Sequence, residues 1–319
     1  MEGVEIIQKK MALVRQAIGR VILGQETVLE QLLCCLVAGG HVLVEGVPGL
    51  GKTLLARTLA RVVDADYGRI QFTPDLLPSD IVGTFVFNPK TTEFVLRRGP
   101  IFREILLADE INRTPPKSQA ALLEAMEEAQ VTIDGIRNSL PDLFFVIATQ
   151  NPVEYEGTYP LPETQLDRFM MKITIDYPSP EAELAVMKSY ADGTELKDVE
   201  SLIQSPLIAK GEVLDFRRAL ASTVVRKEVQ EYIRQIVSET RDPIHVQLGA
   251  STRAAVALLK AARGLAALRG MSFVTPEDVK DVTLPVLRHR VILKPEALID
   301  GLTPDYYLDN VLRRVPVPR

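Results

Sequence analysis

Cysteine is scarce in this sequence. The 319 residues include only two, Cys34 and Cys35, which are neighbours in the apolar stretch Q-L-L-C-C-L-V-A. Adjacent cysteines rarely form an unstrained disulfide, and two sulfur ligands are too few for a structural zinc site. This scarcity excludes a disulfide-stabilised secreted domain. We expect both thiols to be small core residues of a protein in a reducing compartment.

Long apolar runs are also missing. No run approaches the roughly 20 residues that a membrane-spanning helix needs. The first residues, M-E-G-V-E-I-I-Q-K-K, do not have the pattern of a signal peptide. We therefore expect a cytoplasmic protein that does not insert into a membrane.

The chain has no excess of positive charge. It has 37 lysines and arginines against 42 aspartates and glutamates, a formal net charge of −5. This balance provides no general attraction to nucleic acid or to an anionic membrane, although a locally basic channel can exist in an acidic protein. The 46% hydrophobic and 25% charged residues are typical of a soluble globular protein, and the length allows two domains.

A phosphate-binding motif occupies the stretch H-V-L-V-E-G-V-P-G-L-G-K-T at residues 41–53. It matches G-x-x-x-x-G-K-[ST], preceded by an apolar run that predicts a buried strand and followed by helix-forming residues at 54–60. An ordinary glycine turn is the alternative, but the flanking segments favour nucleotide binding. Backbone N–H groups would surround the phosphates, Lys52 would reach the β- and γ-phosphates, and the Thr53 hydroxyl would bind Mg²⁺.

The predicted ligand is ATP with Mg²⁺, and most of its contacts are expected from this loop. The candidate contacts in the loop are Gly46, Val47, Pro48, Gly49, Leu50, Gly51, Lys52, Thr53 and Leu54. The segment V-I-L-G-Q at 21–25 separates two predicted helices, 4–20 and 27–37. It is a candidate cover for the adenine base, with Gly24 and Gln25 as contacts. Plain core packing explains this apolar segment equally well.

Two acids end the next informative strand, I-L-L-A-D-E at 105–110. Four apolar or small residues predict a buried parallel strand whose carboxyl end enters the site. Asp109 suits a direct or outer-sphere Mg²⁺ contact, and Glu110 suits a base that polarises the attacking water. Many strands end in acids, but a pair downstream of a phosphate loop is a strong indication.

A polar residue follows another predicted strand, 143–148. Asn151 is placed to bond the attacking water or the γ-phosphate, and the alternative is an asparagine that caps the turn before Pro152. The acids and the phosphate loop on neighbouring strands favour the functional interpretation. Two β-hairpins are also predicted, at 84–96 and at 131–138, the second around the turn pair Asp134-Gly135.

The remaining pattern divides the chain into two parts. Thr114 is the expected cap of a helix that begins at Pro115, residues 161–169 predict a short helix, and 171–175 predict the last core strand. The sequence Y-P-S-P at 177–180 interrupts the pattern, and the rest of the chain is largely helical, with a polar loop at 192–210. We expect a nucleotide-binding domain at 1–178 and a helical domain at 179–319.

With these motifs in order, the sequence resembles the MoxR group of AAA+ ATPases over nearly its whole length. The matching stretches are G-V-P-G-L-G-K-T, Q-F-T-P-D-L-L-P-S-D, G-P-I-F, A-D-E-I-N-R, A-L-L-E-A-M-E-E, A-T-Q-N-P and L-P-E-T-Q-L-D-R-F.

The resemblance implies an α/β AAA+ core with a five-stranded parallel sheet between helices and β-hairpin insertions, followed by an all-α lid domain. It implies that Asn151 is a sensor, that Arg168 in L-D-R-F is an arginine finger acting in trans, and that Arg253 in G-A-S-T-R is a second sensor. The group usually has proline where this chain has Thr252. Arg113 is a further interface candidate.

The function implied by the resemblance is ATP hydrolysis in a homo-oligomeric ring, expected to be a hexamer, that remodels or assembles protein partners in the manner of a chaperone. The expected client carries a von Willebrand factor A domain, and no nucleic acid is expected. Two alternatives remain open at this stage. One is a nucleic-acid motor of the same AAA+ branch, which the acidic charge disfavours, and the other is a nucleotide-gated scaffold with little turnover, which the intact Asp109-Glu110 pair disfavours.

Overall fold

The computed structural model describes residues 2–152 and 157–318, and its centre is a five-stranded parallel sheet with strand order β2-β5-β8-β1-β9. The strands of this sheet are β1 (Val42–Glu45), β2 (Tyr67–Gln71), β5 (Ile105–Asp109), β8 (Phe145–Gln150) and β9 (Met171–Thr174). The sheet confirms the predicted fold class.

Successive side chains of each strand enter two different hydrophobic cores. Leu107 of β5 belongs to the core under the amino-terminal helices, whereas Leu106 belongs to the core on the other face. The same alternation holds for Val42 and Leu43 of β1, because neighbouring side chains of a strand point to opposite faces. Burial on both faces explains why β1 and β5 are apolar up to their last residue.

Helices cover both faces of the sheet and connect its strands. Those of the amino-terminal half are α1 (Glu2–Gly19), α2 (Glu26–Ala38), α3 (Lys52–Val62), α4 (Pro78–Val82), α5 (Pro116–Glu128) and α6 (Glu163–Leu166), with short 3₁₀ turns η1 (Pro100–Phe102) and η2 (Ile111–Arg113). Helices α1 and α2 begin within two residues of their predicted starts, at Glu2 and Glu26. Helix α5 begins at Pro116 rather than at Pro115, and α6 covers less than the predicted 161–169.

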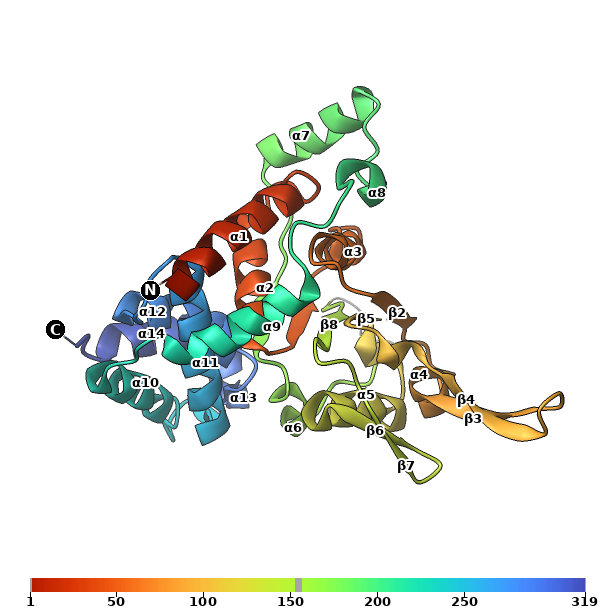
Figure 1. Ribbon diagram of the computed structural model, residues 1–319. Helices are drawn as coiled ribbons and strands as arrows, with labels where there is room; N and C mark the ends of the chain where they lie inside the picture. Colours follow the sequence, from red (N-terminus) through yellow and green to blue (C-terminus); the bar gives the residue numbers. More distant parts are fainter. Residues whose placement is uncertain (1, 153–156, 319) are drawn as a thin grey trace.

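Both predicted hairpins are present and extend from the body, the first beside α4 and the second beside α5 (Figure 1). The first pairs β3 (Gly83–Asn88) with β4 (Glu93–Arg98), and the second pairs β6 (Gln130–Ile133) with β7 (Ile136–Ser139). In the second hairpin Asp134 and Gly135 have φ of 48° and 81°, the positive values that a type I′ turn requires.

Beyond β9, the described residues are mainly helical and include one small antiparallel pair of strands. Its helices are α7 (Pro180–Ala191), α8 (Val199–Leu202), α9 (Lys210–Ala219), α10 (Lys227–Glu239), α11 (Thr252–Leu268), α12 (Pro276–Leu287), α13 (Pro295–Ile299) and α14 (Pro304–Arg314), with the 3₁₀ turn η3 (Leu220–Ser222). The pair is β10 (Val246–Leu248) with β11 (Ile292–Leu293), and α8 lies inside the predicted loop 192–210.

This helical region does not stand apart from the amino-terminal half. Helix α11 packs against α1 and α2 (Figure 1). The buried residues of all three belong to one hydrophobic core. Cys34 and Cys35 are buried in this core as free thiols, as the sequence predicted, and burial raises the pKa of Cys34 to about 12. Within the described residues, no helix has the length and apolarity that crossing a bilayer requires.

Acid should destabilise the protein through His41, which is half-buried and directly precedes β1. Its Nδ1 accepts the N–H of Val146 at 3.0 Å, and burial lowers its pKa from 6.5 to about 4. Since the unfolded chain then binds a proton that the folded chain does not, stability falls as the pH drops from 6.5 towards 4. The loss at pH 5 is ~2 kcal/mol from this group. The free energy of unfolding, measured with denaturant at pH 7.5 and at pH 5, should show this loss. The difference between the two pH values should be smaller in His41→Gln. An equal difference in that variant would contradict the assignment to His41.

Candidate functional site

The phosphate-binding loop connects the carboxyl end of β1 to the first turn of α3. Gly51 caps α3 with φ of 78°, a left-handed conformation that favours glycine. A Cβ on Gly46 would lie 2.7 Å from the carbonyl oxygen of Ile175, so that only glycine fits against the chain after β9. Lys52 Nζ donates to the carbonyl of Gly46 at 2.6 Å. The loop therefore encloses its own lysine at the positive end of a helix, an arrangement suited to phosphate.

A pocket of about 850 Å³ opens beside this loop. Its lining includes Asp109, Glu110 and Asn151, so the structure brings together the acids and the polar residue that the sequence predicted from different strands. The predicted nucleotide contacts that line it are Gln25, Pro48, Gly49, Leu50, Gly51, Lys52, Thr53 and Leu54. The described lining does not include Gly24, Gly46 or Val47.

The apolar side of the pocket comes from two segments. Val21, Ile22 and Leu23, between α1 and α2, form one part, and Val186 and Met187 of α7 form another. Val21 and Ile22 are also buried members of the hydrophobic core. The segment before the loop thus packs in the core and also lines the pocket, and its contact with an adenine base stays a prediction.

Asp109 ends β5 and has both carboxylate oxygens engaged. Oδ1 accepts the hydroxyl of Thr149 at 2.6 Å, and Oδ2 accepts the guanidinium of Arg69 at 2.7 Å. Thr149 is fully buried on β8, next to β5 in the sheet, and its hydroxyl oxygen also accepts the backbone N–H of Glu110 at 2.9 Å. These bonds fix Asp109 and Glu110 relative to strands β5 and β8.

Glu110 comes next in the chain with φ of 58°, a conformation that non-glycine residues seldom adopt. Such strained positions cluster at functional sites. Its Oε2 accepts the side-chain amide of Gln71 at 2.7 Å and lies 3.3 Å from Nε of Arg113. The contacts with Gln71 and Arg113 hold the carboxylate in place directly after the strand.

Arg69 and Gln71 are site residues that the sequence reasoning missed. They are two residues apart on β2, so their side chains share one face of the sheet, and the register pairs Gln71 with Asp109. Arg69 Nη2 also donates to Gln71 Oε1 at 2.6 Å. In the sequence they appear only as two polar residues, separated by one residue, in a predicted strand. Predicting their role would have required knowing that β2 pairs with β5.

Thr53 and Asp109 offer the oxygen ligands that Mg²⁺ prefers. Among the described residues, no group of three or more histidine, cysteine, aspartate or glutamate side chains is arranged to hold a metal. Because Asp109 is already bonded to Thr149 and Arg69, it suits an outer-sphere contact. The residues fit an ion that keeps several waters and takes further ligands from nucleotide phosphates, as Mg²⁺ does.

Arg168 and Arg253 lie in a second, smaller pocket of about 260 Å³, whose lining includes Gly39, Gly40 and His41. These three residues precede β1, whereas the phosphate loop comes after it. The two arginines are therefore at the opposite end of β1 from the loop of the same chain, separated by about 13 Å of strand.

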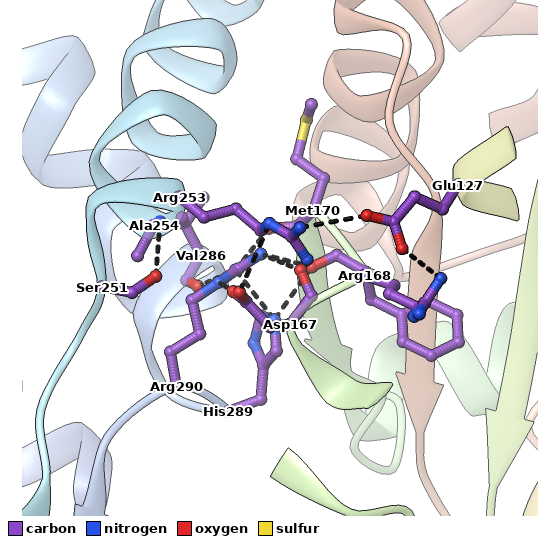
Figure 2. Close-up of polar contacts among 11 residues, drawn as sticks. Glu127, Asp167, Arg168, Met170, Ser251, Arg253, Ala254, Val286, His289 and Arg290 are labelled. Carbon is purple, nitrogen blue, oxygen red and sulfur yellow. Dashed lines mark hydrogen bonds and ion pairs between the residues drawn. The ribbon is translucent and has the colours of Figure 1, made fainter. Parts of the chain in front are cut away.

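One acid, Glu127, bridges this pair of arginines, and a second, Asp167, contacts Arg253 (Figure 2). Glu127 Oε2 forms an ion pair with Arg168, and its Oε1 lies 3.0 Å from Nη2 of Arg253. Asp167 Oδ2 is 3.8 Å from Nε of Arg253. The structure thus brings together the two arginines predicted from distant sequence positions, away from the first pocket.

Comparisons with known proteins agree on the class of this chain. A sequence model of the family described as "ATPase family associated with various cellular activities (AAA)" matches residues 41–171, and one described as "AAA lid domain" matches 238–309. The chain is 47% identical over 301 residues to the uncharacterised protein YeaC of Bacillus subtilis, covering 94% of this chain and 92% of that protein. It is 43% identical over 309 residues to chaperone MoxR1 of Mycobacterium tuberculosis, covering 94% and 80%.

A solved structure is similar over the full length. The crystal structure of a protein from Cytophaga hutchinsonii superposes with a TM-score of 0.91 and 41% sequence identity, covering 100% of this chain and 98% of that chain. The arrangement of sheet, hairpins and helical region is therefore shared with a protein of known structure.

Proposed function

Because this chain belongs to the MoxR family of AAA+ ATPases, we propose that it hydrolyses ATP in a closed ring of identical subunits and uses the cycle to remodel a partner protein. The observation that carries this proposal is the separation of the reaction machinery into two halves at opposite ends of β1. We also propose the division into a nucleotide-binding domain, 1–178, and a lid domain, 179–319. The two family matches, 41–171 and 238–309, fall on either side of that division.

The residues of the first pocket have distinct roles in the proposed reaction. Lys52 and the backbone N–H groups of the loop bind and orient the phosphates, and Glu110 accepts a proton from the attacking water. Asn151, buried at the tip of β8, orients that water or the γ-phosphate. Thr53 and Asp109 would hold Mg²⁺, which neutralises charge on the phosphate oxygens when it is bound.

Arg168 and Arg253 complete the site of the adjacent subunit in this proposal. Phosphoryl transfer develops charge on the γ-phosphate oxygens, and an arginine supplied from outside the pocket stabilises it. Both arginines lie at the end of β1 remote from their own loop, which supports a role in trans for Arg253 as well as for Arg168. A surface that binds a different surface of the next copy generates a ring when its rotation closes, and a hexamer is the expected size.

A protein partner is favoured over nucleic acid by the surface of the longer hairpin. Phe87 and Phe94 pack edge to face near its tip and are 50% and 69% exposed. Exposed aromatic side chains are typical of protein interaction sites. The chain's relative named as a chaperone supports the same class, and a separate protein with a von Willebrand factor A domain is the client we propose.

Turnover per subunit should rise with protein concentration until ring formation is complete, since each site needs a neighbour. ATPase assays across a dilution series, with size measured at each concentration, test this. Constant specific activity down to concentrations at which the protein is monomeric would contradict a shared site. Salt-sensitive stimulation by DNA would instead support a nucleic-acid motor, and activity at background throughout would support a scaffold.

A further inference from the structure

Arg290 is a buried charge for which the proposed reaction has no role so far. It lies just beyond the carboxyl end of α12, and only 4% of its side chain is exposed. A buried cation is costly unless it is paired and its donors are satisfied. A hydrophobic side chain at this position would avoid the desolvation cost of a buried charge. The hydrogen bonds of Arg290 therefore need an explanation.

The donors of Arg290 converge on the short segment that carries Arg168 (Figure 2). Nε donates to Asp167 Oδ1 at 2.6 Å, and Nη2 donates to the carbonyl oxygens of Asp167 and Phe169 at 3.0 and 2.7 Å. Nη1 donates to the carbonyl of Met170 at 3.1 Å and also to that of Val286 on α12, which ties the guanidinium to its own helix. One rigid guanidinium thus binds the chain on both sides of Arg168, a geometry that the single ammonium of lysine cannot reproduce.

The same cluster links Arg290 to Arg168 and Arg253. Asp167 lies between Arg290 and Arg253, and Glu127 lies between Arg253 and Arg168 (Figure 2). Arg168 and Arg253 have 27% and 55% of their side chains exposed, so the series runs from a buried anchor to an accessible surface. Three arginines against two carboxylates leave one positive charge, which suits an anionic phosphate.

We propose that Arg290 is a positioning residue that fixes the 167–170 segment to the helical region, so that Arg168 and Arg253 face the neighbouring nucleotide as one unit. This inference rests on the proposed function in trans. Arg290 touches no nucleotide in this arrangement and acts through Asp167 and the backbone around Arg168.

A subunit-mixing assay separates this role from general stability. Arg168→Ala subunits keep an intact pocket but lack the finger, whereas Glu110→Gln subunits lack turnover but keep the finger. Mixed rings should recover ATPase activity, because Glu110→Gln subunits complete the pockets of Arg168→Ala neighbours. Adding Arg290→Lys to the Glu110→Gln donor should reduce that recovery at least tenfold, while the donor's own affinity for a fluorescent ATP analogue stays within twofold.

Arg288→Lys in the same donor is the matched control. Arg288 is a neighbouring, mostly buried arginine, but it bonds Thr174 and Asp305 rather than the 167–170 segment, so its recovery should equal that of the unmodified donor. Asp167→Asn repeats the test with little change in shape and decides the question if Arg290→Lys subunits do not fold. If the Arg290→Lys and Asp167→Asn donors restored as much ATPase activity as the unmodified Glu110→Gln donor, the inference would be overturned. No recovery with the unmodified donor would instead refute the finger in trans, and the inference with it.

Discussion

Replacing Arg168 with alanine should lower ATP turnover on the order of a thousandfold or more, the range measured for arginine fingers, with little change in ATP affinity. The side chain is remote from the phosphate loop of its own chain, so each subunit's own pocket is left intact. The loss would appear in kcat, because the guanidinium stabilises charge that develops only in the transition state.

Steady-state assays above the concentration of ring formation, with direct nucleotide-binding measurements, test this expectation. Arg218→Ala is a suitable control, since Arg218 is 76% exposed on α9 and pairs with Asp215 of the same helix, outside both pockets. It should change neither quantity. Turnover of Arg168→Ala close to that of the unmodified protein would remove the arginine from the catalytic machinery.

The second large effect is expected from Glu110→Gln. Glutamine keeps the length and planarity of the side chain but cannot accept the proton, so turnover should fall by about 10²- to 10⁴-fold. The bonds that fix Asp109 come from Thr149 and Arg69 and do not involve this carboxylate. ATP binding should therefore persist, and the ring should remain in its ATP-bound form.

Lys52→Ala provides the contrast for this experiment, because it removes the positive charge that binds the phosphates. It should lose ATP affinity, whereas Glu110→Gln should retain it and should co-purify with the partner protein when ATP is present. If Glu110→Gln hydrolysed ATP as fast as the unmodified protein, a group other than Glu110 would have to activate the water.

The local sequence was enough to predict the loop and the acids. The pattern G-x-x-x-x-G-K-T fixes a strand, a loop and a helix within a dozen residues, and the apolar run before Asp109 fixes a buried strand. Asn151 was predictable in the same manner from the strand before it. Each of these signals is contained in a segment that is continuous in the chain.

Contacts between segments were beyond the reach of such signals. Gln71 reaches Glu110 only because β2 pairs with β5, and Arg290 reaches Asp167 only because α12 packs beside β9. Glu127 lies on α5 in an ordinary run of helix-forming residues, so nothing in its neighbourhood distinguished it from a solvated surface acid.

The first residue of α5 was predicted wrongly, although the sequence contains the reason for its true position. Pro115 precedes a second proline, and the residue before a proline is driven from helical to extended backbone. Pro115 has φ of −58° and ψ of 154°, and the helix begins at Pro116 instead. Thr114 is fully buried and does not cap the helix.

The hydrophobic core that joins α1, α2 and α11 has a consequence for how the molecule melts. Val14 of α1, Leu33 of α2 and Leu258 of α11 are buried in the same cluster as residues of β1 and β9. Elements that share a core lose their stability together, which favours a single cooperative transition on heating. A fragment ending at residue 178 would keep α1 and α2 but leave their partner helix behind, exposing an apolar surface prone to aggregation.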